Sequence, residues 1–234
     1  MTRKLRSEIL TLNGRDVPVR VQLSRRASHI SLRLDERTGE VDLTLPSGVA
    51  KSEGLDFAHE KASWILRQID ALPEPVPFID GSVVPVMGTD HLIRHHPEAR
   101  GAVWVENGCL NVAGGEPHVS RRVQDWLKKT AKREITWRAH AFAHQLNRTI
   151  ARISIRDPRS RWGSCSDENA LSFSWRIVLA PAGVLEYVVA HEVAHLVELN
   201  HSARFWSLVR DICPDCDVSK YWLKRDGATL HRFG

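Results

Sequence analysis

Two histidines and a glutamate stand at a spacing that suits a metal centre. His191, Glu192 and His195 form an H-E-x-x-H pattern. On an α-helix, side chains four positions apart lie on one face, about 5–6 Å apart at Cβ. Two imidazoles placed in this way can both reach one Zn²⁺ ion, at about 2.0–2.1 Å. Glu192 then points beside the metal, where a general base for a metal-activated water must be.

A third histidine, His201, follows the pattern and can complete the ligand set. It can return to the metal if the helix ends near Leu199 and Asn200 adopts a left-handed turn. Three protein ligands leave one open position, as in catalytic rather than structural zinc sites. The alternative is a core helix with two satisfied histidines. We favour the metal site, because two His and one Glu would otherwise be costly to bury in so apolar a helix.

The elements expected around this pattern belong to the second half of a two-part chain. Apolar periodicity and turn signals predict helices over 119–150, 181–199 and 202–212, and strands over 152–156, 162–166 and 170–179. Residues 1–118 are expected to form a β-rich region with one helix, over 55–72. Gly114, Gly115 and Pro117 mark the boundary between the two parts. The fold class is therefore α+β, with domains at 1–118 and 119–234.

Composition is that of an ordinary globular protein. Of 234 residues, 42% are hydrophobic and 26% are charged. We find no uninterrupted apolar run of about 18 residues, so we expect no membrane span. Basic residues near the N-terminus are not followed by an apolar segment, which argues against a signal peptide. The four cysteines form no dense disulfide framework, so we expect reduced thiols and a cytoplasmic location.

Positive charge gathers on the predicted long helix and the segment after it. Residues 121–161 contain twelve Lys or Arg and three acidic residues, and the whole chain carries a net charge of +5. Such a helix face is usually solvated. It can also attract phosphates, so we expect at most a weak, salt-sensitive association with nucleic acid.

Two further patterns carry less weight. His140 and His144 also stand four apart on a predicted helix, but two ligands do not make a metal site. Cys213 and Cys216 form a C-x-x-C pattern that has no second copy, so we interpret them as reduced packing or surface thiols.

Several motifs, in order along the chain, together resemble the YgjP-like metallopeptidases, relatives of the SprT and WLM groups. They are R-W-G-S-C-S at 161–166, L-S-F-S-W-R at 171–176, Y-V-V-A-H-E-V-A-H at 187–195, N-H-S at 200–202 and F-W at 205–206. The resemblance implies a zincin-type domain over 119–234, with His191, His195 and His201 as zinc ligands and Glu192 as catalytic base. One departure is Ser174, where the family usually has Asn.

We therefore expect a zinc-dependent metallopeptidase, an endopeptidase rather than an exopeptidase, that acts on proteins or peptides. Tyr221 and Arg161 are the candidates for stabilising the oxyanion. The alternative is a nucleic-acid-associated binding module whose zinc site is not catalytic. The presence of Glu192 argues against that alternative, because a structural site has no use for a base at that position.

Overall fold

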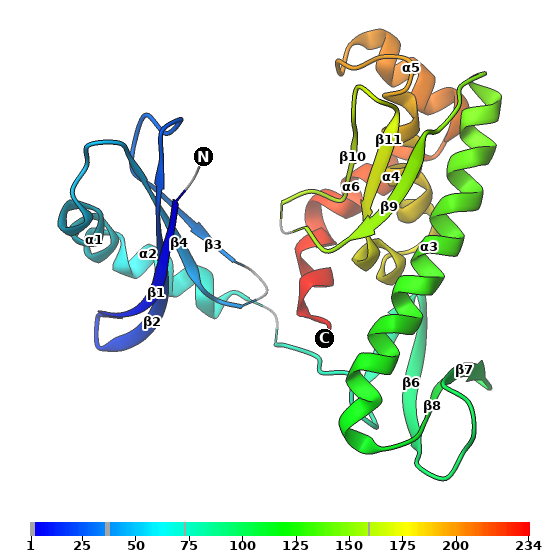
Figure 1. The fold of residues 1–234 in the computed structure, drawn as a ribbon, viewed down its shortest axis with the longest axis horizontal. Helices are drawn as coiled ribbons and strands as arrows, with labels where there is room; N and C mark the ends of the chain where they lie inside the picture. Colours follow the sequence, from blue (N-terminus) through cyan, green and yellow to red (C-terminus); the bar gives the residue numbers. More distant parts are fainter. Residues whose placement is uncertain (1–2, 36–37, 73, 159) are drawn as a thin grey trace. The chain divides into compact units, whose positions relative to one another are not determined.

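The computed structural model describes residues 3–35, 38–72, 74–158 and 160–234. The chain divides into two compact units, Met1–Glu74 and Pro75–Gly234 (Figure 1). Each unit has its own cluster of buried apolar side chains. The boundary that we expected at residue 118 lies inside the second unit. The reason is that Val84 and Val112, which precede it, share a core with Val119 and Val123, which follow it.

The first unit is a four-stranded sheet with two helices. The strands are β1 (Arg3–Leu12), β2 (Arg15–Ser24), β3 (Ser31–Leu34) and β4 (Val41–Pro46), in the order β1-β2-β4-β3. The helix expected over 55–72 is in fact two, α1 (Lys51–Glu60) and α2 (Ala62–Asp70). They are separated at Lys61, whose backbone leaves the helical region at φ −92° and ψ 9°. Alternate residues of β2, among them Val19 and Val21, are fully buried.

The second unit begins with another four-stranded sheet, followed by the longest helix. The strands are β5 (Val83–Val86), β6 (Thr89–His96), β7 (Val103–Glu106) and β8 (Cys109–Ala113), in the order β5-β6-β8-β7. Asn107 and Gly108 form the turn between β7 and β8, and both have positive φ. Helix α3 (Val119–Gln145) spans this sheet and the next one (Figure 1). It ends earlier than expected, and Asn147 follows with φ 53°.

The three-stranded sheet beside the predicted metal site has the order β10-β11-β9. Its strands are β9 (Arg152–Arg156), β10 (Gly163–Cys165) and β11 (Ala170–Ser174). Strand β11 is parallel to β9 and antiparallel to β10, so β10 lies at an edge. The strand expected over 170–179 ends at Ser174, whose side chain accepts a hydrogen bond from the Arg176 amide. The chain then forms a buried 3₁₀ helix, η2 (Trp175–Leu179).

Three helices and a terminal 3₁₀ segment complete the second unit. They are α4 (Ala182–Ala194), α5 (Ala203–Ile212), α6 (Cys216–Asp226) and η3 (Gly227–Arg232). Helix α4 contacts α3, α5 and α6, and nine of its residues are buried. Helix α6 was not predicted. Within the described residues, no helix is both long and apolar enough to cross a membrane.

Candidate metal centre

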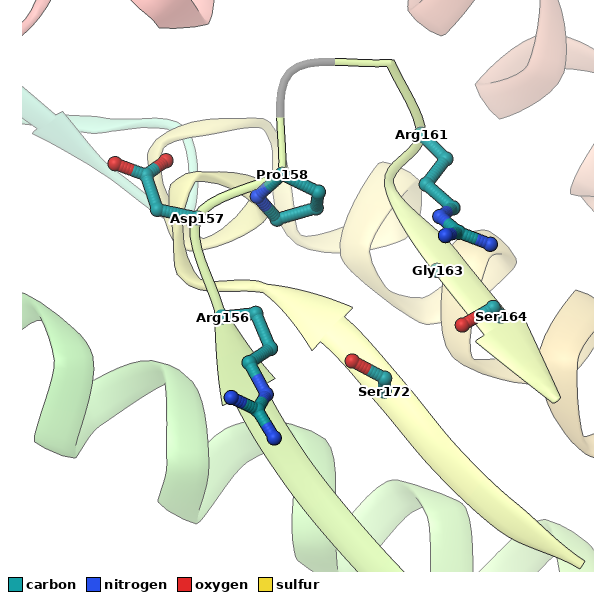
Figure 2. Close-up of a pocket in the computed structure, with 7 residues that line it drawn as sticks. All are labelled: Arg156, Asp157, Pro158, Arg161, Gly163, Ser164 and Ser172. Carbon is teal, nitrogen blue, oxygen red and sulfur yellow. The ribbon is translucent and has the colours of Figure 1, made fainter. Parts of the chain in front are cut away.

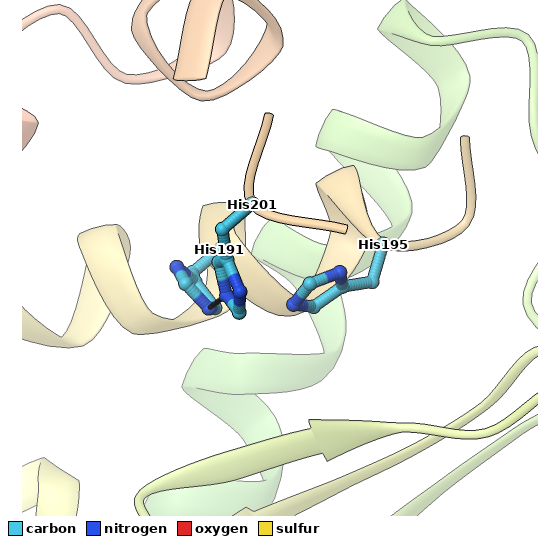
Figure 3. A group of neighbouring side chains, drawn as sticks. All are labelled: His191, His195 and His201. Atoms are coloured by element: carbon cyan, nitrogen blue, oxygen red, sulfur yellow. Dashed lines mark hydrogen bonds between the residues drawn. The ribbon is translucent and has the colours of Figure 1, made fainter. Parts of the chain in front are cut away.

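Three imidazoles converge at the end of α4. His191 and His195 project from α4 and its C-cap, and His201 projects from the segment that leads to α5 (Figure 3). The potential ligand atoms of the three residues all lie within 4.8 Å of one another. Nε2 of His191 and Nε2 of His201 lie 3.0 Å apart. Among the described residues, no other group of three His, Cys, Asp or Glu side chains is placed to hold a metal ion.

The chain returns to the metal centre by a different route from the one predicted. Helix α4 ends at Ala194, and His195 is its C-cap with helical backbone angles. The amides of Val197 and Glu198 then both bond to the Ala194 carbonyl, which closes a tight turn. The left-handed turn predicted for Asn200 is wrong, since the residue does not have positive φ. The early end of the helix supplies the reversal instead.

Two neighbours orient the imidazoles. Nδ1 of His195 lies 3.0 Å from the carbonyl oxygen of Glu198. Because a carbonyl can only accept, Nδ1 carries the hydrogen and Nε2 is left with its lone pair for a metal. Phe205 is fully buried, and its ring centroid lies 4.6–4.9 Å from the centroids of all three imidazoles. Ser202 is the N-cap of α5: its side chain accepts a hydrogen bond from the Phe205 amide and so fixes the start of the helix.

Electrostatics favours the neutral, ligating form of His191 and His195. Burial lowers the pKa of His191 to about 4, and His195, His201 and Lys220 add repulsion to its charged form. Burial also lowers the pKa of His195, against the effect of its bond to Glu198. His191 is therefore neutral at pH 7, and a neutral imidazole is the form that binds a metal. These observations fit a cation bound by three nitrogens.

The side chain of Glu192 occupies space that is free because residue 163 is a glycine. Its side chain is only 7% exposed, and it packs against Gly163 at the start of β10. A Cβ at position 163 would lie 2.5 Å from Cγ and 2.6 Å from Oε1 of Glu192. Gly163 therefore admits the carboxylate, a role that we did not assign from the sequence. A glycine inside a strand was the available signal, because it often marks a close approach.

The environment of Glu192 suits proton transfer. Burial raises its pKa from the ordinary value of 4.5 to about 7, and the positive charge of Arg161 opposes part of this increase. A general base is most effective when its pKa lies near the working pH. Glu192 is not one of the three residues that converge as potential metal ligands.

A cavity of about 250 Å³ joins Glu192 and His191 to an apolar wall. Trp162, Val188 and Leu223 supply that wall, and Arg161 lines the same cavity. Of the two oxyanion candidates, Arg161 therefore lies at the site. Tyr221 is 64% exposed on α6 and does not line the cavity. Tyr187 does line it, and burial raises the pKa of this phenol to about 12, so it stays protonated.

Similarity to known proteins agrees with this arrangement. The family described as YgjP-like, metallopeptidase domain, matches residues 28–226 of the chain. Neither a curated protein nor a solved structure gives a significant match.

Proposed function

The chain belongs to the YgjP-like metallopeptidase family, and on this basis we propose that it is a zinc-dependent peptidase that hydrolyses peptide bonds in proteins or peptides. The convergence of His191, His195 and His201 beside the buried carboxylate of Glu192 is the observation that carries the proposal. A purely structural site would not need a carboxylate with a pKa of about 7 next to it.

In this proposal the three imidazoles hold Zn²⁺. Nitrogen ligands suit this ion, and three of them leave a coordination position open for substrate or water. When bound, Zn²⁺ supplies Lewis acidity to the scissile carbonyl and lowers the pKa of water. The carbonyl of Glu198 keeps His195 in the tautomer that offers Nε2, and the buried Phe205 ring packs against all three imidazoles.

Glu192 is then the residue that moves the proton. Its carboxylate takes a proton from the attacking water and later gives it to the leaving amine. The buried setting keeps competing water away from the carboxylate and brings its pKa close to neutrality. Arg161, which lines the same cavity, is our candidate for balancing the negative charge that develops on the carbonyl oxygen.

The edge of β10 is the proposed place for the substrate backbone. Within the described part of the chain, strand β10 pairs only with β11, and its first residue, Gly163, contacts Glu192. An extended peptide can therefore add to the sheet next to the catalytic carboxylate. Strand pairing recognises main-chain groups and needs no free chain end, so we propose an endopeptidase. The apolar wall of the 250 Å³ cavity would take a side chain next to the scissile bond.

The test compares wild type with Glu192→Gln, each loaded with zinc, on a diverse peptide library. We expect the variant to keep its zinc and to lose turnover by about 100- to 10,000-fold, the usual contribution of a general base. Undiminished turnover would assign the base to another residue. If both proteins bind zinc and neither cleaves any peptide, the non-catalytic binding module is the better account.

A further inference from the structure

The sheet next to the metal centre has one apolar and one polar face. Leu171 and Phe173 of β11 are fully buried against the core. Ser164 of β10 stands directly opposite Ser172 of β11, and both are half-buried on the other face. On β9, Arg156 lies on that same polar face, because the parallel register pairs Ser172 with Ser154, two residues before it.

This polar face forms a cavity with two guanidinium groups. Arg156, Ser172, Ser164 and Arg161 line a space of about 400 Å³ (Figure 2). Figure 2 shows Arg161 extending beside Gly163 and Ser164, while the two serine side chains project from adjacent strands. Within the described residues, neither Arg156 nor Arg161 forms an ion pair.

Among the described residues that line this cavity, the one acidic residue is already engaged. Asp157 accepts hydrogen bonds from Arg176, at 2.7 Å from Nε and 3.2 Å from Nη2. Arg176 is only 1% exposed, so its pairing with Asp157 is part of the core. The cavity therefore presents two guanidinium groups that form no ion pair with the described residues, together with two hydroxyl groups. This combination is suited to an anion.

The positive lining connects the metal centre with α3. Arg161 and Gly163 line both this cavity and the one that contains His191 and Glu192. On its other side, Arg156 also lines a cavity of about 380 Å³ with Lys128, Lys129 and Lys132 of α3. A ligand that lies along this path would remain in a positive potential up to the reacting groups.

We propose that the cavity between Arg156 and Arg161 binds the carboxylate of an acidic substrate side chain, so that Asp or Glu is preferred near the scissile bond. This rests on the proposed peptidase function. A segment paired along β10 would point alternate side chains toward α4 and toward the polar face. Those on the polar face would lie beside Ser164, within the reach of two guanidinium forks that match a carboxylate. The direct continuity with the β10 edge favours a peptide over a nucleic-acid backbone.

The experiment uses the zinc-loaded protein and a peptide that wild type cleaves. Asp, Asn or Lys is placed in turn at each position around the scissile bond, and kcat/KM is measured at low salt. At one position or more, we expect wild type to cleave the Asp peptide with a kcat/KM about tenfold higher than the Asn peptide. In Arg156→Glu the order should reverse, so that kcat/KM is higher for the Lys peptide than for the Asp peptide. Arg156→Gln should remove the preference without reversing it. Arg152→Glu is the matched control, because Arg152 is exposed on the same strand and face but does not line the cavity.

Binding gives a second readout that does not depend on turnover. Fluorescence anisotropy of a labelled Asp-containing peptide on Glu192→Gln should show about tenfold weaker binding when Arg156→Glu is added. An Asp-to-Lys ratio that Arg156→Glu leaves unchanged would overturn this proposal while leaving the peptidase function intact. If wild type cleaves no peptide, the peptidase function fails, and the anisotropy result decides the anion site by itself. The proposal would also be overturned if a single-stranded oligonucleotide bound through Arg156 while peptides with Asp were cleaved no faster than peptides with Asn.

Discussion

Two pairs of histidines in the second unit share the same spacing, and only one pair belongs to a candidate metal centre. His191 and His195 end α4 within 4.8 Å of a third imidazole. His140 and His144 are exposed on α3, and no third His, Cys, Asp or Glu in the described residues joins them. Spacing on a helix brings two nitrogens together, but a third ligand from another segment makes the site.

The two histidine pairs differ in their surroundings as well as in the number of potential ligands. His191 packs against Phe205 and Tyr187, and burial lowers its pKa to about 4. Such a setting keeps an imidazole neutral and fixes its orientation before a metal arrives. The exposed pair on α3 has no comparable enclosure.

Removal of the proposed third ligand, His201, should have the largest effect. His201→Ala leaves only two nitrogens, like the pair on α3. Loss of a residue that merely hydrogen-bonds to a metal ligand lowers metal affinity or activity by up to about 100-fold. Because His201→Ala removes a ligand itself, we expect zinc affinity and peptidase activity to fall by more than this. Chelator competition measures the affinity, and His144→Ala is the control for a histidine of similar spacing. Normal affinity in His201→Ala would remove this residue from the ligand set.

Displacement of Glu192, the proposed base, should have the next largest effect. In Gly163→Ala the new Cβ would lie 2.5 Å from Cγ of Glu192, so the carboxylate must move. A shift of about 1 Å in a catalytic group can cost about 100-fold in rate. We expect kcat to fall by up to this amount while zinc binding persists. Gly183→Ala on α4 is the control, because its Cβ would meet only Ser219 Oγ, at 3.3 Å. Equal activity of the two variants would contradict the role given to Gly163.

The pKa of Glu192 predicts a pH-dependent cost in stability for the metal-free protein. Burial raises this pKa to about 7, above its ordinary value of 4.5. Ionisation is thus harder in the folded state, so this residue lowers stability progressively from about pH 4.5 to 7 and fully above pH 7. The measured quantity is the free energy of unfolding of Glu192→Gln minus that of wild type, both without zinc. This difference should be about 2–3 kcal/mol larger at pH 8 than at pH 4.5. Urea unfolding measures this gain, and a difference that is independent of pH would show that the carboxylate is not buried.

Removal of the exposed pair should have the smallest effect. His140→Ala combined with His144→Ala should leave zinc stoichiometry and activity unchanged. The free energy of unfolding should change by no more than about 0.5 kcal/mol, as for ordinary surface substitutions. Metal analysis after dialysis is the measurement. A lower zinc content in this double variant would mean that α3 carries a metal of its own.

The comparison also shows what could be predicted from the sequence. The strand Arg152–Arg156 and the start of α3 at Val119 were predicted correctly, since local periodicity and turn residues determine them. The end of α4 was not predicted correctly, because apolar residues continue through Leu196 and Leu199 and no helix-breaking residue intervenes. Hydrogen bonds at the Ala194 carbonyl and at His195 end it instead.

Two other features depend on contacts between segments that are distant in the sequence. Helix α6 was missed because only two of its residues, Cys216 and Ser219, are buried, so it has no apolar stripe to recognise. The role of Gly163 depends on the approach of α4 to β10. The motif therefore predicts the ligands and the base, while the neighbours that hold them require the fold.

X-ray absorption at the zinc edge tests the three-histidine centre most directly. We predict one zinc per chain, with about three imidazole nitrogens at about 2.0–2.1 Å, one further light atom and no sulfur. Loss of one imidazole from the spectrum of His201→Ala would support the assignment. A sulfur ligand at about 2.3 Å, or a protein that binds no zinc, would contradict it.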